Sequence, residues 1–334
     1  MRKEGGIRSL SAKCDEYYCK ASGVALFYAG MGRLEIFVLA FAFLAGCGAA
    51  FGESVFAPGT FAGDTRYDVK KVAYGAEGSS DSLLCWAASA SNNLQLWQDN
   101  LANSGYVIPG GIPNGKTQEV YSTDIFYVFA NSWEDEGSYS LIAYQWYMTG
   151  NYDTSIVEGM GASKPLPDPM SDGGYWAFLG YDMNDLAERI DLAGSISTPA
   201  QKTWLADALE MVFGNGFYAS LTVNNWNNHS VTLTGYEYDP LSNDITGLWI
   251  CDSDNPNTDS NFLVDISWNE TLDSWILGEA HIDESEIVSD YSLEGWWVAG
   301  MEVFKAPMPV PEPSIYAAIF GAFALAFAAF PRRK

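Results

Sequence analysis

The chain has 334 residues, of which 48% are hydrophobic, so it is long enough for one large core or two small domains. It carries 17 basic and 42 acidic residues, a net charge of −25, and such a surface repels phosphate backbones and disfavours anionic lipid. Nucleic acid is therefore excluded as a partner class, and the five cysteines are too few for a disulfide scaffold.

The first 52 residues have the pattern of an export signal. An apolar run at 36–45 follows Arg33 and is followed by small residues. The run has the length of a signal-peptide core and is too short to span a bilayer. Because the preceding segment is long, Met31 fits a true start codon. Cleavage near residues 50–52 is one interpretation, and a lipoprotein signal acylated at Cys47 is the other.

The body of the chain, residues 53–309, changes character along its length. It predicts helices first, at 82–101 with Asp81 or Ser82 as cap, at 121–130, at 183–192 and at 200–213, with a strand-like run at 140–148. Strands are predicted at 217–223, 230–238, 247–251 and 296–304. A helical front half followed by a β-rich back half predicts an α+β fold.

The last 25 residues, 310–334, form a second processing segment. The order is Val310-Pro311-Glu312-Pro313, an apolar stretch at 315–330, and a basic end at 332–334. This order resembles the PEP-CTERM sorting signal. The resemblance implies an exosortase-type processing enzyme as partner, transient membrane contact through the apolar helix, and a destination at the cell surface or extracellular matrix of a Gram-negative bacterium. A plain tail anchor is the alternative.

Cys85 is the candidate nucleophile. It stands at the start of the predicted 82–101 helix, where free amide groups and the helix dipole favour a thiolate, and small residues follow it. A buried structural cysteine is the alternative interpretation. Cys251, the other cysteine of the body, is expected to lie in the core and to remain reduced.

His229 is the candidate base. It begins a predicted strand and follows Cys85 by 144 residues, within the spacing of about 130–150 residues described for papain-like enzymes. His281, the other histidine of the body, lies in an acidic segment and matches no catalytic pattern.

Asp252 is the candidate orienting group. A predicted strand ends at Asp252-Ser253-Asp254, where a carboxylate could accept a hydrogen bond from the imidazole and fix its tautomer. A calcium loop formed by Asp252, Asp254 and Asn257 is the alternative, although no glutamate stands at the spacing of an EF-hand.

These blocks together resemble the IdeS/Mac family of secreted, papain-like cysteine peptidases, which includes immunoglobulin-degrading enzymes. The resemblance spans roughly residues 64–304. It is carried by 83–100, by 229–235, by 252–254 and, upstream, by Tyr67-Asp68-Val69-Lys70. The middle of the chain has no convincing match, so immunoglobulin specificity is not transferred.

The resemblance implies a papain-like cysteine peptidase fold and a role for each residue. Cys85 would be the nucleophile, His229 the base and Asp252 its orienting group, with Asp254 in support. Lys70 would help to bind the oxyanion, with Lys71 as the alternative because the segment before Cys85 looks longer than usual. No metal or organic cofactor is implied.

The sequence therefore predicts an exported cysteine endopeptidase that hydrolyses extracellular proteins through a thioester acyl-enzyme. Transamidation by the same triad is a further possibility that sequence does not separate from proteolysis. The alternative is a non-catalytic surface or matrix-binding protein on the same fold, since aromatic residues make up 15% of the chain.

Overall fold

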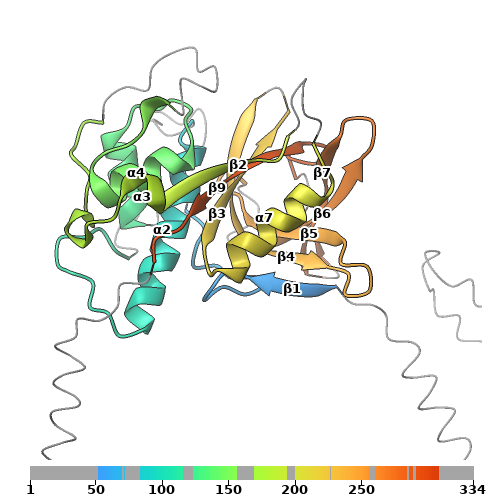
Figure 1. The fold of residues 1–334 in the computed structure, drawn as a ribbon, viewed down its shortest axis with the longest axis horizontal. Coiled ribbons are helices and arrows are strands. Elements are labelled where there is room, and N and C mark those ends of the chain that lie inside the picture. Colours follow the sequence, from blue (N-terminus) through green and yellow to red (C-terminus); the bar gives the residue numbers. More distant parts are fainter. Residues whose placement is uncertain are drawn as a thin grey trace, which may run out of the picture. The chain divides into compact units, whose positions relative to one another are not determined.

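The fold is a layer of helices packed on an antiparallel β-sheet, in a computed structural model of the chain (Figure 1). The structure describes residues 52–69, 71, 83–115, 123–155, 169–193, 200–225, 227–255, 260–283, 286–288 and 291–307. The predicted export signal, the predicted sorting segment, Met31, Cys47, Lys70 and the predicted cap at Asp81 or Ser82 lie outside these ranges. No helix among the described residues is long and apolar enough to cross a membrane.

The helices are α2 (Cys85–Asn103), α3 (Asp124–Ser132), α4 (Ser140–Thr149), the short α6 (Met183–Leu186) and α7 (Thr203–Gly214), with a 3₁₀ turn at Ala177–Leu179. The strands are β1 (Glu53–Phe56), β2 (Ala187–Asp191), β3 (Tyr218–Asn224), β4 (Asn228–Tyr238), β5 (Ile245–Cys251), β6 (Phe262–Asn269), β7 (Ser274–Asp283), β8 (Glu286–Ile287) and β9 (Trp297–Phe304). The predicted α+β class is thus confirmed.

All described strands belong to one antiparallel sheet of order β2-β9-β3-β4-β5-β6-β7-β8, with β1 added beside β4. β9 pairs with β3 along its length and also meets β7 through Ile276 and Trp297. This second pairing closes β3, β4, β5, β6, β7 and β9 on themselves as a small barrel.

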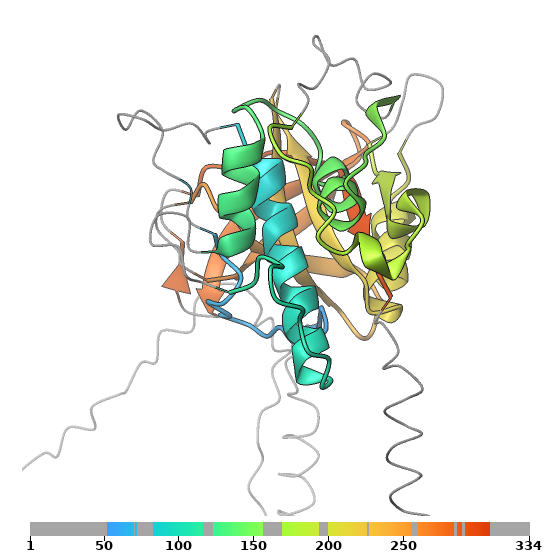
Figure 2. The ribbon, with the colours of Figure 1, turned by 90° about the vertical axis from the view of Figure 1, so that its left-hand side faces the viewer.

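One face of β9, β3 and β4 is covered by α2 and α4 (Figure 2). α2 is buried over most of its length, and its far end packs Trp97 edge-on against Phe304 of β9 at 5.7 Å between ring centroids. α7 lies on the other side of β3 in Figure 1, where Phe213 packs against Tyr236 of β4. β3 and β4 therefore have α2 on one side and α7 on the other.

Two predicted elements are wrong. The strand-like run at 140–148 is the helix α4, and every residue from Ser140 to Met148 is buried. A helix buried all round has no polar face and hence no amphipathic period, so its β-prone aromatic residues misled the prediction. The predicted helix at 183–192 stops at Leu186, because the next five residues pair with β9 as β2.

The predicted helices at 121–130 and 200–213 are present as α3 and α7, shifted by a few residues. The four predicted strands are present as β3, β4, β5 and β9. Between them, β6 and β7 were not predicted, although Phe262, Val264 and Ile266 alternate as buried residues with more exposed neighbours in β6.

Candidate active site

Cys85 is the first residue of α2. The helix was predicted to begin at Ser82 with a side-chain cap, but it begins at Cys85 after Leu84, and no side chain caps it. The first amides of a helix have no acceptor within the helix, and the dipole there is positive. Cys85 as a residue is half-buried, and it stands at the end of the helix where a thiolate is stabilised.

His229 is the second residue of β4 and meets the end of β5. Its Nε2 donates to Oδ1 of Asp252 at 2.8 Å. The Asp252 side chain is 1% exposed, and the same oxygen accepts the backbone N–H of Asp254 at 3.1 Å. The pairing of Thr232 with Cys251 in neighbouring strands brings the two side chains together. Asp252 therefore holds the imidazole in one orientation.

The other side of the imidazole faces the thiol. Cys85 and His229 are hydrogen-bonded through their side chains. Because Nε2 is bonded to Asp252, we assign the contact with the sulfur to Nδ1, which also lies 3.5 Å from Oδ2 of Asp254. The structure thus brings Cys85, His229 and Asp252 together, with the imidazole interacting with both the thiol and the carboxylate.

The electrostatics of these three residues favour an ion pair. Burial acts to raise the pKa of the Cys85 thiol, but the hydrogen bond with His229 and the charges of His229 and Lys71 outweigh it, so this pKa lies below its ordinary value. Burial acts to lower the pKa of His229, but the Asp252 carboxylate and the Cys85 sulfur raise it well above its ordinary value. Thiolate and imidazolium are therefore favoured together.

Asp254 and Lys71 extend the site on its charged side. Oδ2 of Asp254 lies 3.5 Å from Nδ1 of His229, and its Oδ1 lies 2.7 Å from Nζ of Lys71. The Lys71 side chain is only 4% exposed. Of the two predicted lysines, Lys71 is the one that the structure brings to the site, whereas Lys70 is outside the described residues.

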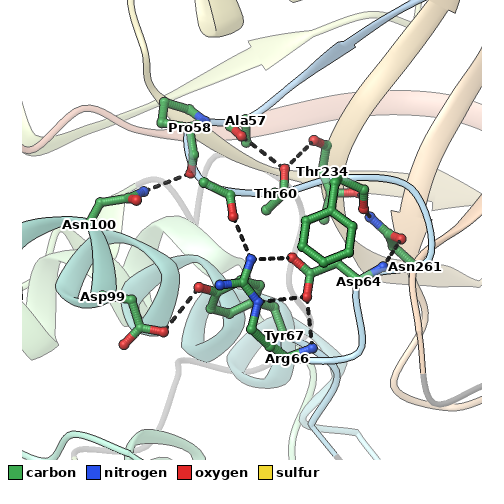
Figure 3. A network of polar contacts seen from close by, with 12 residues as sticks. Ala57, Pro58, Thr60, Asp64, Arg66, Tyr67, Asp99, Asn100, Thr234 and Asn261 are labelled. Carbon is green, nitrogen blue, oxygen red and sulfur yellow. Dashed lines mark hydrogen bonds and ion pairs between the residues drawn. The ribbon is translucent and has the colours of Figure 1, made fainter. Parts of the chain in front are cut away.

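The segment that carries Lys71 is fixed by a polar network between β1 and the site (Figure 3). Asp64, which is 1% exposed, accepts two hydrogen bonds from the guanidinium of Arg66, and its backbone N–H donates to Asn261. Tyr67 donates to Asp99 of α2 at 3.0 Å. The segment is thereby anchored both to α2 and to the loop before β6, and Lys71 follows four residues after Tyr67.

The other histidine and the other cysteine of residues 53–309 have different surroundings. His281 on β7 faces Asp265 of β6, with Nε2 and Oδ2 3.3 Å apart. Cys251 is buried, and neither it nor Cys85 belongs to a disulfide. Among the described residues no group of His, Cys, Asp and Glu has the arrangement of a metal site. Asn257 of the alternative calcium loop is outside those residues.

Trp296 and Tyr291, near the site, were not predicted from the sequence. Trp296 stands edge-on to His229 at 6.4 Å between ring centroids. Tyr291, whose pKa burial raises well above its ordinary value, also lies within the influence of Asp252. Trp296 and Tyr291 lie more than 200 residues after Cys85 in the chain, and no local spacing connects them to it.

Neither the models of protein families nor the curated proteins with which the sequence was compared give a match to this chain.

Proposed function

We propose that this chain is an exported cysteine endopeptidase that hydrolyses peptide bonds of extracellular proteins. The observation that carries the proposal is the arrangement of Cys85, His229 and Asp252, with the imidazole bonded on one side to the thiol and on the other to a buried carboxylate. This is the geometry of an activated nucleophile with an oriented base.

The chemistry follows from the site. The Cys85 thiolate attacks the substrate carbonyl, and the carbonyl carbon becomes tetrahedral while its oxygen takes the negative charge. Amides of the first turn of α2 stabilise that oxygen, and imidazolium at His229 protonates the leaving amine. Water, deprotonated by His229, then hydrolyses the thioester and releases the thiolate.

The architecture supports a papain-like peptidase fold. A nucleophile at the start of a long helix lies on one layer, and a base at the start of a barrel strand lies on the other. The resemblance to the IdeS/Mac family, stated above for the sequence, implies the same division of labour. We therefore propose proteins as the substrate class and assign no cleavage sequence.

Turnover and labelling of the purified full chain test this proposal. Cys85→Ala should abolish cleavage of a fluorescent unfolded protein, such as labelled casein, while Cys251→Ser should keep most of it. Iodoacetamide should label Cys85 near neutral pH, as located by peptide mass analysis. A wild-type chain that neither cleaves nor labels at Cys85 would favour the non-catalytic binding protein instead.

The proposed location depends on the two terminal segments, which are read from sequence alone. We expect export directed by the first 52 residues, and surface or matrix delivery after an exosortase-type enzyme acts near residues 311–314. Intact-mass analysis of the protein from its native host should show a C-terminus in that range. A chain retained through Lys334 in the surface fraction would indicate a permanent anchor.

A further inference from the structure

The connection between α3 and α4 holds the first turn of α2. The carboxylate of Asp135 accepts the backbone N–H of Leu83, and the carbonyl of Glu136 accepts the indole N–H of Trp86 at 2.9 Å. Ser140, the first residue of α4, donates from Oγ to the carbonyl of Trp86 at 2.8 Å. Three hydrogen bonds from residues 135–140 therefore converge on the residues either side of Cys85.

Ser140 also reaches the strand that carries His229. Its Oγ lies 3.2 Å from Oγ of Ser230, the residue after His229. A serine hydroxyl has one proton, and that of Ser140 goes to Trp86, so Ser230 is the donor of this second bond. The result is a chain from Ser230 through Ser140 to the carbonyl of Trp86.

This chain joins the two layers of the molecule at the site. Ser140 is fully buried and Ser230 is 8% exposed, so no solvent competes for either hydroxyl. Trp86 follows the candidate nucleophile on α2, and Ser230 follows the candidate base on β4. One hydroxyl therefore bonds to the neighbours of both reacting groups.

Other bonds between α2 and the sheet lie further along the helix. Ser89 donates to Ser220 at 2.6 Å, and Asn92 donates to Thr232 at 2.9 Å. These contacts would still hold α2 on the sheet without Ser140. Loss of the Ser140 hydroxyl should therefore loosen the first turn without detaching the helix.

We propose that Ser140 is a positioning residue that sets the distance and alignment between the Cys85 thiol and the His229 imidazole. The inference rests on the proposed nucleophile and base. An error of about 1 Å in the placement of reacting groups can cost about 100-fold in rate, so a single buried hydroxyl at this junction is sufficient to matter.

The pH dependence of thiol labelling separates positioning from stability. The charged groups that act on the Cys85 thiol are His229, Lys71 and Asp254. Ser140→Ala removes none of these charges. A shift of the labelling profile in this variant therefore reports a changed contact between thiol and imidazole.

The experiment compares four variants of the full chain: Ser140→Ala, Ser230→Ala, the double variant of these two, and the control Ser132→Ala. Ser132 is a buried serine that also bonds to another serine, Ser171, at 2.6 Å. The rate of iodoacetamide labelling at Cys85 is measured from pH 4 to 10, with kcat and KM for labelled casein and a thermal melt.

For Ser140→Ala we expect the rise of labelling with pH to move to higher pH, and kcat to fall by about 10–100-fold with little change in KM. Ser230→Ala should shift both in the same direction but less, because the bond to Trp86 remains. The double variant should be no worse than Ser140→Ala, and Ser132→Ala should match the wild type.

If Ser140→Ala and Ser230→Ala both keep the wild-type labelling profile and the wild-type kcat, the proposal is overturned. Ser140 would then have a structural role only, whether or not the variants lower the melting temperature. If Ser140→Ala does not fold, Ser230→Ala alone decides between these outcomes. Rapid labelling of wild-type Cys85 without any protein cleavage would refute the peptidase function, and the labelling profiles would still test Ser140.

Discussion

Lys71 and Asp254 form an ion pair of 2.7 Å whose lysine is almost fully buried and whose aspartate is 40% exposed. The other carboxylate oxygen of Asp254 lies 3.5 Å from His229. Lys71 thus neutralises an acid that would otherwise raise the pKa of the thiol, and its own charge lowers that pKa. We derive the first prediction from this double effect.

Lys71→Met should lower kcat by about 100-fold, the lower part of the range for a lost oxyanion donor, which is the role that the family resemblance implies for a lysine here. It should also move Cys85 labelling to higher pH, because the Asp254 charge is then unopposed. Lys202→Met is the matched control, since Lys202 pairs at the surface with Asp244 at 3.2 Å and should keep full activity. A large loss in Lys70→Met with none in Lys71→Met would show that the first lysine acts instead.

Asp252 and Asp254 should differ sharply in importance. Asp252→Asn removes the carboxylate that holds Nε2 of His229, and loss of such an orienting acid costs about 10⁴-fold in kcat. Asp254→Asn loses partly exposed ion pairs, each worth about 1 kcal/mol or less, so its kcat should fall no more than about tenfold. Steady-state kinetics of the two variants measure this, and equal losses would contradict the assignment of Asp252 as the orienting group.

Activity should show a bell-shaped dependence on pH. It rises as Cys85 loses its proton, at a pH below the ordinary thiol pKa, and falls as the imidazolium of His229 loses its proton, above the ordinary imidazole pKa. His229→Ala should abolish turnover and move Cys85 labelling upward, because burial of the thiol is then less opposed. His281→Ala should leave both profiles unchanged. If Cys85 of the wild type is labelled with the pH dependence of an ordinary thiol, then Cys85 and His229 do not form a thiolate–imidazolium pair.

Sequence reasoning reached Cys85, His229 and Asp252 because each stands at the end of a recognisable element. A cysteine at a helix start and a histidine at a strand start can be placed by periodicity, and the acid follows the next strand directly. The same reasoning named Lys70, with Lys71 as the alternative, and could not fix the register, since a shift of one residue reverses the direction of a side chain in an extended segment.

The contacts that hold the site could not be predicted in this way. Ser140 lies in a stretch that was predicted to be a strand, and every residue from Ser140 to Met148 is buried, so no pattern separates one face from another. Trp296 reaches His229 only because β9 pairs with β3 and β7. Both depend on pairing between segments that are far apart in the chain, which single-sequence periodicity does not contain.

A buried ion pair beside the site gives the last prediction. Glu302 of β9 is fully buried, accepts a hydrogen bond from Thr222 at 2.9 Å, and pairs with Arg189 of β2. Burial raises the pKa of Glu302 more than Arg189 lowers it. The charge of Glu302 is therefore costly to bury even when it is paired.

Arg189→Met should destabilise the fold by about 3–5 kcal/mol at pH 7, because it leaves Glu302 charged and unpaired in the interior. The variant raises the folded-state pKa of Glu302 further above its unfolded value, so the folded state binds the proton more tightly. The destabilisation should therefore shrink as the pH falls towards 5 and Glu302 is protonated. Lys305→Met is the control, since Lys305, the residue after β9, pairs with the half-exposed Glu188 of β2 at 3.0 Å. Its loss should cost about 1 kcal/mol or less at either pH. Urea denaturation at pH 5 and pH 7 measures both variants, and equal costs for Arg189→Met at the two pH values would mean that Glu302 does not carry the charge.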